Sequence, residues 1–240
     1  MRLEEFCSRF KVLLEQNPET TQIFRTGEPL VREVLGDNQW FGEILHKLIS
    51  DPSFSERQGP SVFANEVSLY RNPDRLFSVL AYIWEPHTLC EVHDHSSWGI
   101  IGSLFRPVKE IRYRRLDDGR LEGYAELEQL SSRVIEPGET ARVLPLDKGI
   151  HQTGSASDQF SISLGVYGRS IRKGYFQLFT PSQKKVVRAY QPKLFKQILA
   201  IRALKSAPDL WGKELSAASS ASLPQYLAKE FWDSQDSKFR

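Results

Sequence analysis

The sequence predicts a mainly β protein in which helical segments precede and follow one long run of short strands. Apolar residues recur at helical spacing in the first fifty residues, and strand-like runs separated by turns occupy about residues 62–175. A broad apolar helical stripe returns after Pro181. Many short strands joined by frequent turns indicate a sandwich or a barrel. We therefore divide the chain into an N-terminal helical segment (1–60) packing on a barrel (61–180), and a basic helical extension (181–240).

The N-terminal segment is expected to contain helices that end at prolines. The first is predicted from apolar residues on one helical face: Leu3, Phe6, Phe10, Leu13 and Leu14. Asn17-Pro18 ends this helix, because proline cannot continue the helical hydrogen-bond ladder. A second apolar series from Trp40 to Ile49 ends at Asp51-Pro52, and Gly59-Pro60 marks the change to strands.

The first strands of the central region are predicted from apolar runs and turns. Residues 76–84 and 97–105 are nearly continuous apolar runs, typical of strands buried on both faces. Residues 109–116 and 121–127 are predicted to form a hairpin, because Asp118-Gly119 between them suits a tight turn.

The last predicted strands follow further turn signals. A turn at residues 136–139 leads into a strand over 141–146. In the next strand Phe160, Ile162, Leu164 and Val166 alternate with Ser161, Ser163, Gly165 and Tyr167. Because successive side chains of a strand point to opposite faces, one face is apolar and the other is expected to line a polar cavity.

The C-terminal extension is predicted to be helical and basic. Its apolar stripe comprises Leu194, Phe195, Ile198, Leu199, Ile201 and Leu204. Residues 216–222 are expected to be a flexible connector before a short helix at about 225–232. Residues 181–240 contain 11 Lys or Arg against 5 Asp or Glu. This excess is typical of a solvated helical surface, with docking of an acidic partner as the alternative.

Composition narrows the classes of function. A net charge of +2 is too small to favour nucleic acid or a membrane as the main partner. We expect no secretory leader, because acidic residues and an arginine lie where a leader needs an apolar run. We also expect no transmembrane helix, because no apolar run approaches ~18 residues. Two cysteines, far apart in the sequence, do not imply a disulfide framework. A reducing cytoplasm is therefore the expected compartment.

The sharpest chemical signal is a pair of histidines. His93 and His95 flank Asp94, and residues two apart on a strand point to the same face. Both imidazoles can therefore reach one metal ion while Asp94 points away. A third ligand must come from another strand, and His151 follows a Pro-x-x-x-Gly-x-His turn. We predict a metal site formed by these three histidines.

These residues resemble the metal-binding motifs of the cupins. His93 and His95 match the first motif and His151 matches the second, which implies a cupin double-stranded β-helix, or jelly-roll barrel. The glutamate that usually follows the first motif is missing between Ser96 and Ile100. A site of three histidines is instead similar to that of the thiol dioxygenases, the cysteine dioxygenase-like family. Trp84-Glu85-Pro86 and Trp98-Gly99 agree with this likeness.

The resemblance implies Fe(II) as the metal and oxidation of a thiol to a sulfinate by O₂. Imidazole also suits zinc, copper and nickel, so the ligands alone do not name the metal. Three neutral histidines leave a divalent ion its full charge, which a thiolate and a second anionic group can neutralise. The implied substrate is a small carboxylate-bearing thiol of the cysteine or mercaptopropionate type.

The resemblance also implies residues that contact the substrate. The family binds the substrate carboxylate with an arginine, and Arg71 matches a Tyr-x-Arg-Asn-like element. A solvated surface arginine is the alternative for this position. Arg169 and Arg172 are alternative clamps, and Trp98 is taken as a further substrate-binding residue.

The family's Ser-x-His-x-Tyr pattern falls on Ser163, Gly165 and Tyr167. Ser163 and Tyr167 are therefore the candidate catalytic residues, with Tyr167 as a hydrogen-bond donor to bound oxygen. Glycine replaces the histidine that orients this tyrosine. Gly165 either leaves room for a larger substrate or indicates a loss of efficient thiol oxidation.

Two other functions compete with thiol oxidation. One is another three-histidine cupin oxygenase that acts on a non-thiol chelating substrate. The other is a non-catalytic metallocupin that binds a small molecule. Fold alone does not choose among them, because cupins host many chemistries. A homodimer is compatible with all three functions.

Overall fold

Four helices precede the strands in the computed structural model, which describes residues 1–172 and 174–206. The helices are α1 (Leu3–Glu15), α2 (Thr20–Leu35), α3 (Gln39–Ser50) and α4 (Pro52–Gln58). The sequence missed α2 and α4 as separate elements. Asp51-Pro52, predicted as a stop, also starts α4: the Asp51 side chain accepts a hydrogen bond from the backbone N–H of Phe54 at 3.0 Å.

Eleven strands in the described residues form two antiparallel sheets. The first sheet has the order β1 (Glu66–Arg71), β2 (Phe77–Trp84), β9 (Ser161–Gly168), β4 (Gly99–Phe105) and β7 (Thr140–Val143). The second has the order β11 (Lys185–Tyr190), β10 (Tyr175–Thr180), β3 (Val92–His95), β8 (Leu146–Ser155), β5 (Val108–Arg115) and β6 (Leu127–Ile135).

The strand order identifies the barrel as a jelly roll. Strands β2 to β9 divide into a β2-β9-β4-β7 half and a β3-β8-β5-β6 half, and the chain crosses repeatedly between them. This double-stranded arrangement of eight strands is that of cupins. The predicted fold class is therefore confirmed: a cupin barrel with N-terminal helices and a C-terminal helix, α5 (Pro192–Ser206).

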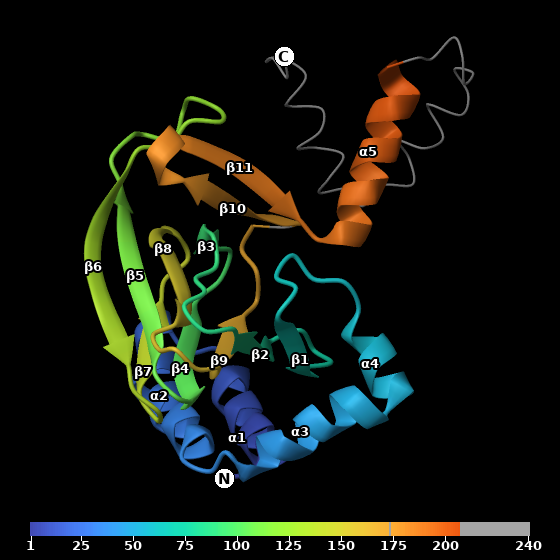
Figure 1. The fold of residues 1–240 in the computed structure, drawn as a ribbon, viewed down its shortest axis with the longest axis vertical. Helices are drawn as coiled ribbons and strands as arrows, with labels where there is room; N and C mark the ends of the chain where they lie inside the picture. The colour runs from blue at the N-terminus through green and yellow to red at the C-terminus, as the bar shows by residue number, and fades with distance from the viewer. Residues whose placement is uncertain (173, 207–240) are drawn as a thin grey trace.

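The N-terminal helices cover the outer face of the first sheet (Figure 1). Alternate residues of β9, namely Ile162, Leu164 and Val166, are buried in one cluster with apolar residues of α1, α2 and α3. The other alternate residues, Ser163, Gly165 and Tyr167, line a cavity inside the barrel. The alternation seen in the sequence thus separates a face packed on helices from a face that lines the site.

The hairpin prediction was wrong in its second strand. β5 pairs with β6, whose residues 127–135 lie beyond the predicted 121–127. The side chain of Asp117 organises the connection instead of a two-residue turn. It accepts hydrogen bonds from the backbone N–H groups of Gly119 and Glu126, at 3.0 and 2.8 Å, and pairs with Arg115.

The chain after Pro181 also differs from the prediction. Residues 185–190 form β11, which pairs with β10, so the sheet extends past the predicted end at 180. The predicted apolar helix is observed as α5, in which Ile198 is buried while Phe195 and Leu199 are exposed. The predicted connector at 216–222 and the helix at 225–232 lie outside the described residues.

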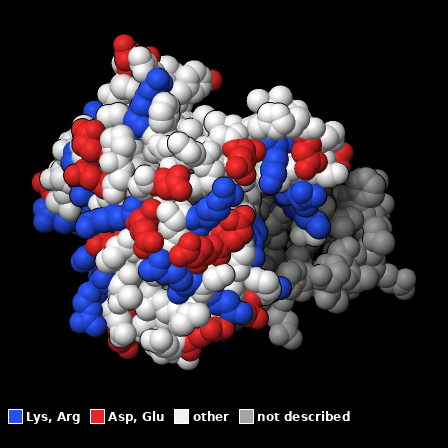
Figure 2. All heavy atoms as spheres, turned by 90° about the horizontal axis from the view of Figure 1, so that it is seen from below, with Lys and Arg blue, Asp and Glu red and all other residues white. Residues whose placement is uncertain are grey.

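Surface charge on the helical side is mixed. On the face shown in Figure 2, acidic and basic side chains are interspersed, and neither sign forms an extended patch. Among the described residues, no helix combines the length and the hydropathy required to cross a membrane.

Candidate metal centre

The pleat of β3 sends its two histidines and Asp94 in opposite directions. His93 and His95 face the barrel interior, as the sequence predicted. Asp94 is buried on the opposite side, where its carboxylate accepts hydrogen bonds from Arg172 and from the backbone N–H of Gln177, both at 2.6 Å. Asp94 therefore holds β3 against β10 and the preceding loop, and is not directed at the site.

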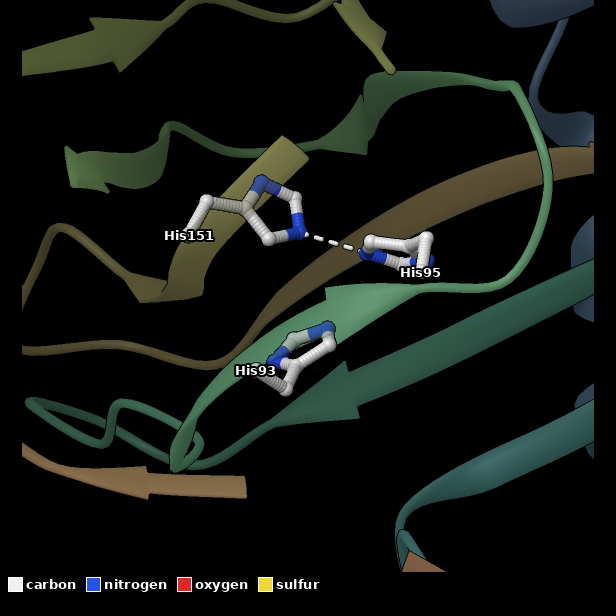
Figure 3. Close-up of side chains that lie close together, drawn as sticks. All are labelled: His93, His95 and His151. Atoms are coloured by element: carbon white, nitrogen blue, oxygen red, sulfur yellow. Dashed lines mark hydrogen bonds between the residues drawn. The ribbon is translucent and has the colours of Figure 1, made fainter. Parts of the chain in front are cut away.

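The third histidine lies directly opposite the first. His93 on β3 is the cross-strand partner of His151 on β8. One ligand atom from each of the three imidazoles lies within 4.8 Å of the others, and Nε2 of His95 is 2.8 Å from Nε2 of His151 (Figure 3). Two imidazoles at right angles on a metal with bonds of about 2.1 Å would place their nitrogens about 3 Å apart. The trio therefore fits one metal ion.

In His93 and His151, a hydrogen bond at one ring nitrogen leaves the other nitrogen available to bind a metal. Nδ1 of His93 lies 2.9 Å from the carbonyl oxygen of Glu91, and Nδ1 of His151 lies 3.0 Å from Oε1 of Glu110. Both contacts require Nδ1–H as the donor, which leaves Nε2 of each ring with a free lone pair. Metal-ligating histidines are usually oriented in this way.

Glu110, on β5, is a functional residue that the sequence did not indicate. It is fully buried, and Arg112 and Arg133 hold its second oxygen at 3.1 and 2.8 Å. Burial alone would raise the pKa of Glu110, but the contacts with His151 and Arg112 outweigh burial and lower it to about 2. Glu110 is therefore an anion that supports a metal ligand without being one.

Burial also keeps two of the imidazoles neutral. The pKa of His151 is lowered to about 4, first by burial and then by the charge of His93, against the opposing effect of Glu110. Burial lowers the pKa of His95 well below its usual value, and His93 and His151 add to this shift. Neutral imidazole is the form that binds metal.

The cavity beside the histidines is small and mostly apolar. Its volume is about 20 Å³, enough for about one water molecule. The lining residues beside His93 and His151 include Phe63, Trp84, Ile101, Val108 and Ile135. The ring of Phe63 lies 5.0 Å from that of His93 and stacks on Phe176 at 5.5 Å. An aromatic pair thus packs against His93 at one side of the site.

Cys90 also lines the cavity and contacts a ligand. Its Sγ lies 3.7 Å from Nδ1 of His93 and accepts a hydrogen bond from the backbone N–H of Thr153 at 3.4 Å. Burial alone would raise the pKa of this thiol, but the charge of His93 and these hydrogen bonds lower it. The contact between Cys90 and His93 was not expected from the sequence.

Both candidate catalytic residues lie in the cavity. Ser163 is buried, and its Oγ accepts a hydrogen bond from Nε1 of Trp84 at 2.8 Å. The ring of Tyr167 stacks on that of His95, with centroids 5.3 Å apart and planes 11° apart. Their catalytic roles remain predictions, but their positions agree with them.

Arg71 is not placed where a carboxylate clamp is needed. Its side chain is 70% exposed, bonds Ser68 Oγ at 3.1 Å and lies 4.0 Å from Glu66. Arg71 ends β1, which is an edge strand, and does not line the cavity. The alternative clamps are also engaged elsewhere: Arg172 binds Asp94, and Arg169 donates to the backbone carbonyl of Asp74.

Trp98 has a packing role instead of the predicted substrate contact. Its indole lies against Gly168, where an added Cβ would approach it to 2.3 Å, and its ring centroid is 6.1 Å from that of Phe10. Trp98 therefore joins the N-terminal helices to β9, and it does not line the cavity.

Comparisons with known proteins find only distant structural likenesses. No known family model matches the chain. Similar solved structures include a cupin-like protein from Thermotoga maritima, with 14% identity over 50% of this chain and 83% of the other, at a TM-score of 0.36. The Cupin_2 domain of an XRE family transcriptional regulator from Enterobacter cloacae has 14% identity over 45% of this chain and 96% of the other, at a TM-score of 0.32. DMSP lyase DddQ from Ruegeria pomeroyi DSS-3 has 14% identity over 45% of each chain, at 0.33.

These likenesses are too distant to transfer an activity. The strand order and the site define the class of fold: the chain forms a cupin-type barrel that brings three histidines together. Within the described residues, the side chains grouped closely enough to hold a metal ion are histidines, with no carboxylate among them.

Proposed function

We propose that the protein is an iron-dependent dioxygenase that oxidises a small thiol to a sulfinate with O₂. The observation that carries the proposal is the ligand set of His93, His95 and His151 without a carboxylate. Such a set leaves a divalent ion its full charge, which favours an anionic thiolate as a further ligand. Three side chains on one side of the ion also leave positions for a substrate and for oxygen.

The overall reaction is balanced without another reductant. A thiol and one O₂ give a sulfinate and a proton, so sulfur loses the four electrons that O₂ gains. Bound Fe(II) would supply the contact through which thiolate and O₂ meet. The chain supplies the rest: Glu110 and the Glu91 carbonyl orient two imidazoles, and apolar side chains line part of the cavity beside them.

A substrate carboxylate has no cationic partner in the cavity itself. The described residues that line the cavity include neither arginine nor lysine. A substrate carboxylate would therefore have to bind outside this cavity. Assays should compare cysteine and mercaptopropionate with cysteamine, which lacks a carboxylate. Equal oxidation of all three compounds would show that the enzyme needs the thiol of its substrate but neither the carboxylate nor an arginine that binds it.

Oxygen uptake with a small thiol tests the proposal directly. Protein fully loaded with Fe(II) should consume O₂ in the presence of at least one of these thiols and form its sulfinate. His93→Ala should lose both bound iron and oxygen uptake. The matched control is His46→Ala on α3, a histidine outside the three-histidine group whose ring is hydrogen-bonded to Ser50. No uptake with any small thiol at full iron loading would overturn thiol oxidation and favour a non-catalytic metallocupin.

The native metal is tested separately. Metal analysis of protein purified without added metal should find iron, and a site filled with zinc or nickel would contradict that part of the proposal. A cytoplasmic location and a homodimer remain proposals of the sequence.

A further inference from the structure

We propose that Tyr82 is the positioning residue for Tyr167, and that Gly165 is the glycine which makes this arrangement fit. The inference rests on the proposed function, because it assigns the hydroxyl of Tyr167 a place in the cavity where the reaction would occur. It starts from the geometry around position 165.

The space above Gly165 is filled by Tyr167 itself. An added Cβ at Gly165 would lie 2.4 Å from Cε2, 2.6 Å from the hydroxyl oxygen and 2.7 Å from Cζ of Tyr167. The phenol ring therefore folds back along its own strand and covers the glycine. The sequence-based expectation that Gly165 leaves room for a larger substrate is wrong in this structure.

A second glycine completes the slot that holds this ring. Gly99 on β4 is the cross-strand partner of Tyr167, and an added Cβ there would lie 2.8 Å from its Cδ1. His95 stacks on the ring with nearly parallel planes. Two glycines and one imidazole thus surround the ring of Tyr167, and no side chain larger than hydrogen fits at either glycine without moving it.

The hydroxyl of Tyr167 finds its partner on the neighbouring strand. Tyr82 on β2 lines the same cavity, two residues beyond Leu80, which is the cross-strand partner of the Gly165 that the Tyr167 ring covers. The interaction with Tyr82 opposes the rise that burial causes in the pKa of Tyr167. On the other side of β2, Glu66 of β1 is the cross-strand partner of Tyr82 and is nearly buried, with 11% of its side chain exposed. Glu66, Tyr82 and Tyr167 thus lie on three adjacent strands.

The same strand serves the other candidate residue of β9. Two residues beyond Tyr82, Trp84 donates to Ser163 Oγ, and the Tyr82 and Trp84 rings stack at 5.7 Å. One face of β2 therefore orients one face of β9. A histidine at position 165 would have been a neighbour of Tyr167 on the same strand, β9. Here the residue next to Tyr167 is Tyr82, which belongs to the paired strand β2.

Tyr82→Phe tests the inference, because it removes the hydroxyl and keeps the ring that packs on Trp84. The control is Tyr70→Phe, which removes a hydroxyl hydrogen-bonded to Asn72 on β1 outside the cavity. In metal-free protein with ¹³C-labelled tyrosine rings, Tyr167→Phe identifies the signals of Tyr167. Tyr82→Phe should broaden or split those signals, and Tyr70→Phe should leave them unchanged.

Kinetics gives the second readout in the iron-loaded enzyme. Tyr82→Phe should lower kcat for the thiol about as far as Tyr167→Phe does, with KM and iron content unchanged. The double variant should lose no more than either single one, because both changes remove the same oriented hydroxyl. A single sharp set of Tyr167 signals in Tyr82→Phe, or a wild-type kcat, would overturn the inference. If the wild-type protein oxidises no thiol, the metal-free spectra still decide the position of Tyr167.

Discussion

The carboxylate of Glu110 lies 3.0 Å from Nδ1 of His151, and two arginines hold its other oxygen. The histidine is thereby oriented by a group that is itself held in place. This pair lies across β5 and β8, where Glu110 is the cross-strand partner of Thr153 and precedes the partner of His151 by two residues. Its position makes it a support for the metal ligand.

We expect Glu110→Gln to weaken metal binding about 10- to 100-fold, because the neutral amide is a poorer acceptor for Nδ1–H. The measurement is a competition titration with a chelator of known affinity. Glu28→Gln is the matched control, since Glu28 is an ion-paired carboxylate, 2.6 Å from Arg142, that touches no histidine. Equal affinities in the two variants would show that Glu110 has no part in holding the metal.

Acid should destabilise the metal-free fold through His151. Its folded-state pKa of about 4 lies below the unfolded value of 6.5, so between these values the unfolded chain binds the proton. The stability contributed by neutral His151 is therefore full above pH 6.5 and falls by about 3 kcal/mol as pH drops through 4. Denaturant titrations at several pH values should show this loss in wild type.

The control for that experiment is His151→Gln, which cannot titrate in this range. The difference in unfolding free energy between wild type and this variant should change with pH between 6.5 and 4. A constant difference would show that His151 titrates normally in the fold. Comparing two proteins is necessary because the pKa of His93 shifts upward, which opposes the trend.

The grouping of the three histidines was predictable because it depends on local rules. Alternation along a strand places His93 and His95 on one face and Asp94 on the other, whatever the rest of the fold. The same rule brought Ser163 and Tyr167 to the cavity face of β9. His151 could be predicted as the third histidine because a group of three requires one more side chain from a neighbouring strand.

The supporting residues were not predictable because they depend on strand register. Glu110 reaches His151 only through the pairing of β5 with β8, and Tyr82 reaches Tyr167 only through that of β2 with β9. The two residues that were wrongly predicted to bind substrate also depend on features that the sequence does not reveal. Trp98 packs on a helix about ninety positions earlier in the chain, and Arg71 falls on an edge strand with its side chain in solvent.

Gly165→Ala should displace Tyr167 from its slot. The new methyl group would lie 2.4 Å from the ring, so we expect a destabilisation of about 1–3 kcal/mol from overpacking. Chemical denaturation measures this loss. In a Tyr167→Ala background the same change should cost little, because the ring that it strikes is gone.

A second glycine serves as the control, because it separates overpacking against Tyr167 from the general effect of a glycine-to-alanine change on stability. Gly42 on α3 has no heavy atom within 4 Å of an added Cβ, so Gly42→Ala should be neutral or stabilising by up to about 1 kcal/mol. If Gly165→Ala behaves like Gly42→Ala in the wild-type background, the ring of Tyr167 does not rest on Gly165 in solution.

Access to the metal site should depend on Phe63. Phe63 lines the cavity of about 20 Å³, packs against His93 and stacks on Phe176, so it covers one side of the three-histidine group. Phe63 lies in the segment between α4 and β1, which begins at Gly59 with a φ of +63°. We expect Phe63→Ala to speed metal release to an excess of chelator several-fold.

Phe160→Ala, at a ring that is 51% exposed and outside the cavity, should leave the rate unchanged. Phe63→Leu should restore a slow rate, because a branched apolar side chain still covers His93. Identical release rates in Phe63→Ala and wild type would mean that the metal leaves by another path, with this aromatic pair serving only as packing.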